Sequence, residues 1–74
     1  MIRHGLEFKD ETSYLKWCID GYLKGIDYWR KKRFDFSDNP NHVMQIDLQI
    51  GVLQKSVAEC ESQLSDLVHN ANIL

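Results

Sequence analysis

Residues 43–74 read VMQIDLQIGVLQKSVAECESQLSDLVHNANIL, and apolar residues recur in them at alternating steps of three and four. The repeat fills four heptads without a gap. This spacing puts all of these side chains on one stripe of an α-helix, in a pattern typical of coiled coils. The stretch therefore predicts a long helix with a single apolar seam. The seam consists of Val43, Ile46, Ile50, Leu53, Val57, Cys60, Leu64, Leu67, Ala71 and Leu74.

Asn39 and Pro40 mark the start of this helix. An asparagine side chain can cap free backbone amides, and proline suits the first helical turn because its missing N–H would have had no partner there. We expect the helix to span residues 40–73 and to end without a firm stop in a polar stretch.

A shorter run upstream repeats the same spacing and predicts a second helix over residues 10–33, with Asp10 as a plausible cap. Its seam consists of Leu15, Ile19, Tyr22, Ile26 and Trp29. Charges of alternating sign lie on the opposite side, which is typical of a face in water. They are Lys16, Asp20, Lys24, Asp27 and Lys31.

The connection between the helices, residues 34–39, is short and rich in turn-forming residues, so the helices must fold back antiparallel. Residues 1–9 alternate in hydropathy, but Gly5 and their small number argue against a regular strand. We expect them to form an extended covering arm. The fold class is therefore all-α: one domain, residues 1–74, forming an antiparallel two-helix hairpin with a long C-terminal helix.

Two surfaces of the predicted hairpin carry more apolar residues than the two helices can bury between them. The seam of the long helix continues after the shorter helix has run out, and three apolar residues occupy the opposite, outer face near the turn. The distal seam could be covered by the arm through Ile2, Leu6 and Phe8, by a second hairpin or by an unlike protein, and the outer face implies another neighbour. The commonest solution is a twofold pair of hairpins that forms a homodimeric four-helix bundle. The predicted partner-binding residues are Met44, Leu48, Val52, Leu64, Leu67 and Leu74.

One face of the shorter helix carries two glycines, Gly21 and Gly25, between Tyr14, Cys18 and Tyr28. Each glycine costs about 1 kcal/mol of helix propensity relative to alanine. Close approach of another backbone would offset that cost.

The net charge of −2 hides a split, with +3 in residues 1–33 and −5 in residues 34–74. The basic run Arg30, Lys31, Lys32 and Arg33 is flanked by aromatic residues, a combination that suits nucleic acid. The run also suits the C-terminus of a helix, where cations interact favourably with the helix dipole, and we favour this structural interpretation.

Catalytic and metal-binding motifs are missing from the sequence. Cys18 and Cys60 form no CxxC pair, the three histidines lie too far from them in sequence for a zinc motif, and no acidic pair is placed to share a proton. We expect no enzyme activity, no cofactor, and two inert, reduced thiols. No segment suits a membrane span or a signal peptide, so a cytoplasmic protein is the expectation.

The sequence thus predicts a non-enzymatic protein–protein interaction module of the adaptor, co-chaperone or inhibitor type, acting through apolar helix faces. A nucleic-acid-binding helical dimer that uses residues 30–33 is the alternative, and a purely structural oligomer is a third possibility. No motif ties the chain to a known family.

Overall fold

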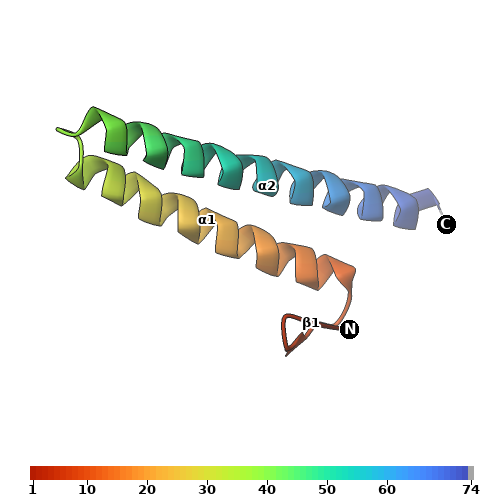
Figure 1. Ribbon diagram of the computed structural model, residues 1–74. Coiled ribbons are helices and arrows are strands. Elements are labelled where there is room, and N and C mark those ends of the chain that lie inside the picture. The colour runs from red at the N-terminus through yellow and green to blue at the C-terminus, as the bar shows by residue number, and fades with distance from the viewer. Residues whose placement is uncertain (74) are drawn as a thin grey trace.

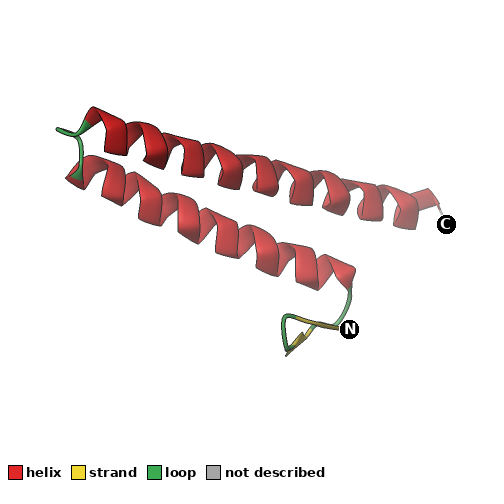
Figure 2. Cartoon of the chain, in the orientation of Figure 1, coloured by secondary structure: helices red, strands yellow, loops and turns green. Residues whose placement is uncertain are grey.

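Two long antiparallel helices make up most of the chain (Figures 1 and 2). The computed structural model describes residues 1–73, and the side chains of residues 1–70. The elements are β1 (Ile2–Arg3), β2 (Leu6–Glu7), α1 (Glu11–Asp35) and α2 (Pro40–Ile73). The prediction of a helical hairpin is confirmed. Helix α1 continues two residues beyond the predicted end, and the short strands are an addition to the all-α prediction.

Both helices begin at side-chain caps. Asp10 accepts a hydrogen bond from the backbone N–H of Ser13 over 2.8 Å, and this bond lowers the pKa of the Asp10 carboxyl. Asn39 accepts one from the N–H of His42 over 3.3 Å, and Pro40 occupies the first position of α2. Each cap satisfies an amide that the helix itself leaves without a partner.

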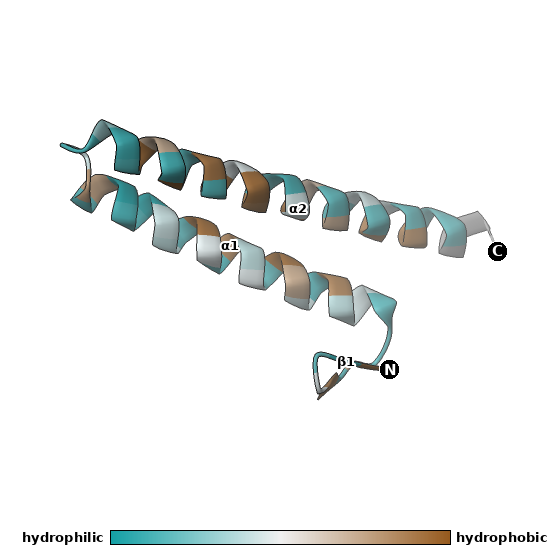
Figure 3. Ribbon diagram, viewed as in Figure 1, coloured by the Kyte–Doolittle hydropathy of each residue, from teal (hydrophilic) through white to brown (hydrophobic). Residues whose placement is uncertain are grey.

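The core is a single row of aliphatic side chains between α1 and α2. Ile46 is the most deeply buried, with 2% of its surface exposed. The other buried members are Leu15, Ile26, Ile50 and Val57. Ile19, Tyr22, Trp29 and Leu53 pack against this row and are partly buried. Apolar and polar bands alternate along both ribbons (Figure 3), as expected for helices that each bury one stripe.

Gly25 marks a close contact between the helices. A Cβ atom at Gly25 would lie 3.1 Å from Cδ1 of Leu53.

Residues 1–9 form a small β-hairpin, which corrects the prediction of an arm without regular strands. His4 and Gly5 have φ angles of 55° and 75°, and two consecutive positive values suit the tight turn that joins two antiparallel strands. Ile2 pairs with Glu7 and Arg3 with Leu6. The hairpin lies beside the first turns of α1, on the side away from α2 (Figure 1). Its aromatic contacts are with α1, so it is not the cover expected for the α2 seam.

Replacing Gly21 with alanine should stabilise the hairpin by about 0.5–1 kcal/mol, because alanine favours helix and the added methyl enters open space. Gly25→Ala should gain less, since Leu53 must move to admit the Cβ. Thermal unfolding followed by circular dichroism measures both. Equal gains at the two sites would contradict the close contact at Gly25.

Candidate protein-binding surface

The outer face of α2 next to the turn carries three exposed apolar side chains. Met44, Leu48 and Val52, here called the turn-proximal patch, are 61%, 64% and 61% exposed. They lie four residues apart, while Ile46 and Ile50 between them are buried against α1. Residues four apart lie on the same helix face, so the three form one stripe opposite the seam. This stripe is the clearest unpaired apolar surface in the structure.

The apolar character of this outer face ends after Val52. The next residues in the same orientation are Lys55 and Glu59, and both are exposed. On the turn side a shallow, open hollow of about 560 Å³ borders the patch. Its lining residues are Ser37, Pro40, Val43, Met44, Asp47 and Leu48. The patch is therefore a bounded surface about two and a half helical turns long.

An ion pair borders this hollow. The Arg33 Nε atom donates to Oδ1 of Asp47 over 2.8 Å, and both side chains are about half exposed. Exposed pairs of this kind contribute at most about 1 kcal/mol, so the pair links α1 to α2 next to the turn without adding much stability. The apolar patch thus lies beside a polar margin with fixed geometry.

The other predicted binding residues do not join this patch. Leu64 and Leu67 are half-buried, and Thr12 and Lys16 of α1 line a shallow hollow together with Leu64. The first turn of α1 therefore reaches the distal seam, which is less exposed than expected. Sixteen residues, or about 24 Å of helix, separate Leu48 from Leu64, and the two point to opposite faces. Leu74 lies outside the described residues.

The hairpin exposes more surface than a compact chain of its length. Its accessible area is 5799 Å², whereas a compact monomer of this length should expose about 4,700 Å². Its radius of gyration is 15.9 Å, against about 11 Å for a globular domain of 74 residues. The excess area is comparable to the roughly 800 Å² that each partner contributes to a standard protein interface.

The basic run does not form a single cationic face. Successive residues of a helix point about 100° apart, so four in a row spread around it. Arg33 pairs with Asp47, and Lys31 pairs with Asp27 over 3.0 Å. The ammonium group of Lys32 lies 5.6 Å from the ring centre of Tyr28.

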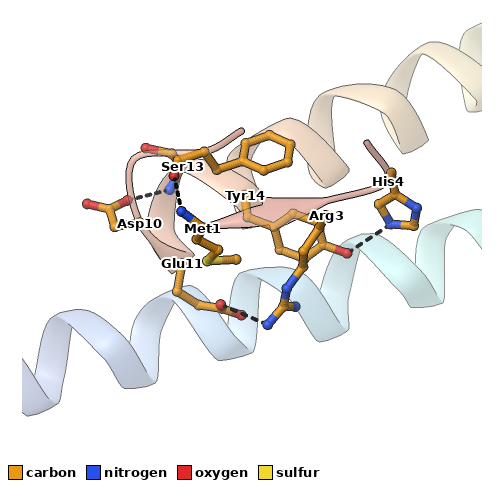
Figure 4. Close-up of polar contacts among 8 residues, drawn as sticks. Met1, Arg3, His4, Asp10, Glu11, Ser13 and Tyr14 are labelled. Atoms are coloured by element: carbon orange, nitrogen blue, oxygen red, sulfur yellow. Dashed lines mark hydrogen bonds and ion pairs between the residues drawn. The ribbon is translucent and has the colours of Figure 1, made fainter. Parts of the chain in front are cut away.

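An aromatic cluster joins the β-hairpin to α1, and sequence reasoning missed it. Phe8 packs against the Tyr14 and Trp17 rings at centroid distances of 5.3 and 5.4 Å. Nε2 of His4 lies 3.2 Å from the Tyr14 hydroxyl (Figure 4). The Arg3 guanidinium lies over the Tyr14 ring and pairs with Glu11. The signal in the sequence was the alternation of residues 2–8 around a glycine.

A hollow of about 460 Å³ opens beside this cluster, above Gly21. His4, Trp17, Cys18 and Tyr22 contribute to its walls. A Cβ on Gly21 would meet nothing within 4 Å, so no part of the hairpin itself explains the glycine there.

Neither thiol is in a disulfide: Cys18 and Cys60 are free and half-buried. Within the described part of the chain, no cluster of three or more His, Cys, Asp or Glu side chains is placed to hold a metal ion. The described helices also include none with the length and apolar content that crossing a membrane requires. Comparisons of the chain with protein-family models, curated proteins and solved structures find no match.

Ile46→Ala should destabilise the hairpin by about 2–5 kcal/mol, because it removes a fully buried side chain. Leu48→Ala, two residues away on the exposed face, should change stability by less than about 0.5 kcal/mol. Urea unfolding of both variants measures the contrast. A large loss of stability for Leu48→Ala would mean that its side chain is covered in solution.

Proposed function

We propose that this chain is a non-enzymatic protein–protein interaction module that binds its partner through the turn-proximal patch. Adaptors, co-chaperones and small inhibitors act in this way. The exposure of Met44, Leu48 and Val52 on one stripe is the observation that carries the proposal. Burying one such side chain contributes about 1.5–3 kcal/mol, so covering the stripe supplies a substantial driving force for association.

The proposed partner is, first, a second copy of the chain. Two hairpins packed together would form a four-helix bundle, the usual way for helical pairs to cover surplus apolar faces. The excess accessible area of the hairpin supports this pairing, because it is comparable to one side of a standard interface. An unlike protein with a complementary apolar groove is the other partner that the same stripe would accept. An oligomer with no further partner would use the stripe in the same way.

Replacing both Leu48 and Val52 with glutamate should abolish association, since carboxylates on the stripe cannot be buried without a large desolvation cost. Light scattering measures the mass in solution. We expect a dimer for the unchanged chain and a monomer for the double variant. A matched control, Gln54→Glu with Ser62→Glu, adds the same charge to exposed positions outside the patch and should remain dimeric.

The two kinds of partner give different results in this experiment. If the unchanged chain is already a monomer, the patch is free for an unlike protein. If the double variant has the same mass as an unchanged dimer, the patch is not the dimer interface. The proposal fails if the double variant retains both self-association and every interaction of the unchanged chain.

Nucleic-acid binding is the second candidate function. It is favoured by Arg30, which has no ion-pair partner among the described residues, and by the aromatic neighbours Tyr28 and Phe34, which are 53% and 82% exposed. The neutralised state of Lys31 and Arg33 weakens it. The charges left over support at most a weak contact with phosphates.

Salt dependence separates the two functions. Binding through phosphate contacts should weaken steeply between about 50 and 200 mM salt, whereas an interface built on aliphatic burial should change little. Fluorescence anisotropy with labelled single- and double-stranded oligonucleotides measures nucleic-acid binding at each salt concentration. We expect no salt-sensitive binding, and Arg30→Glu with Lys32→Glu should leave self-association intact. Tight, salt-sensitive binding that these changes remove would favour the nucleic-acid function.

A further inference from the structure

We propose that Cys18 and Cys60 are a redox-active pair that forms a reversible disulfide between α1 and α2. The sequence favoured inert thiols. The packing of the helices adds an observation that the sequence lacked, namely which residues of the two helices meet in one layer. This proposal does not depend on what the turn-proximal patch binds.

The register of the two helices places the cysteines opposite each other. Leu53 packs against the Cβ position of Gly25. Cys18 lies seven residues before Gly25, and Cys60 lies seven residues after Leu53. Seven residues are close to two helical turns, so the cysteines repeat the Gly25 and Leu53 positions one heptad further from the turn. They therefore belong to the same interhelical layer.

The cysteines also share one side of the hairpin and one degree of burial. Both are half-buried at the edge of the seam. Cys18 occupies the position equivalent to Gly25, and unlike glycine it has a Cβ that carries a sulfur. Cys60 occupies the position equivalent to Leu53 and has a shorter side chain. A disulfide forms here when the two Cβ atoms reach a separation of about 3.8 Å.

The electrostatics of the pair agree with this placement. Burial raises the pKa of the Cys60 thiol, and nearby Cys18 and Glu59 raise it further. Cys18 contributes to the wall of the open hollow above Gly21, together with His4 and Trp17. A small reagent can therefore reach Cys18 from solvent, while Cys60 is the more shielded partner.

The reaction is thiol–disulfide exchange with a low-molecular-weight disulfide such as oxidised glutathione. The Cys18 thiolate attacks one sulfur of the reagent, which breaks its S–S bond and releases one glutathione thiolate. Cys60 loses its proton, its thiolate attacks the Cys18 sulfur, and the second glutathione leaves. Two protein thiols are oxidised, one reagent disulfide is reduced to two thiols, and the protons pass to the released thiolates.

The disulfide would join the helices far from the turn. It would close a loop of more than forty residues, and the cross-linking of long loops restricts the unfolded chain strongly. The linkage lies one turn before Leu64 in the half of the hairpin that the turn does not hold. Oxidation would therefore fix the separation of the helices where the short connection has least influence.

The test treats the reduced full-length chain with oxidised glutathione under native conditions, at low protein concentration. Intact mass and alkylation of free thiols follow the products. We expect both thiols to disappear with the loss of two hydrogens and no adduct. The melting temperature should rise by about 10–20 °C and return on reduction with dithiothreitol.

Three control variants check the geometry. Cys60→Ser should stop at a single glutathione adduct on Cys18, and Cys18→Ser should form its adduct more slowly because Cys60 is the more shielded thiol. Cys60→Ala with Glu61→Cys keeps two thiols but turns one to the other side of the hairpin, and it should form at least tenfold less intramolecular disulfide. A stable adduct on the unchanged chain, a cross-link between two chains, or no reaction would each overturn the proposal, as would equal oxidation of the shifted variant.

Discussion

The packing of α1 against α2 is the contact on which the rest of this structure depends. One row of aliphatic side chains, centred on Ile46 and Ile26, is almost the whole core. A pair of helices is one layer thick, so each helix can bury only the stripe that faces the other. An apolar side chain that points elsewhere packs against the small β-hairpin, as Trp17 does, or faces solvent or another molecule. The seam therefore defines both the interior of the hairpin and the apolar surface that stays exposed.

The outer face of α2 carries apolar side chains that this packing leaves exposed. Further along this face, Lys55 and Glu59 are charged and exposed, as expected for a helix face in water. The Asn39 cap and the Arg33–Asp47 ion pair stabilise the structure locally at the turn. Met44, Leu48 and Val52 are apolar and exposed on the same face, and they add nothing to the core. Exposed stripes of this kind are typical of interaction sites. The surplus lies on the outer face near the turn, whereas the distal seam contributes less because the start of α1 partly covers Leu64.

Much of the fold could be predicted from the sequence because its signals are local and periodic. The three-four repeat, Asp10 and Asn39 at the caps, and the short polar connection define two antiparallel helices. Features that depend on three-dimensional contact were missed. The β-hairpin depends on the backbone at His4 and on aromatic packing against Trp17. The exposure of Met44, Leu48 and Val52 follows from helical periodicity. The lower exposure of Leu64 depends on how far the first turn of α1 reaches, which heptad counting does not determine.

The two ends of the hairpin are held in different ways. At the turn, a connection of four residues, the Asn39 cap and the Arg33–Asp47 pair fix the helices directly. At the other end no connection joins them, and α1 instead supports the β-hairpin on its far side (Figure 1). An apolar partner at the turn would therefore meet a surface whose shape is already set, at little cost in ordering. A covalent link between Cys18 and Cys60 acts on the opposite half, where only side-chain packing resists separation of the helices.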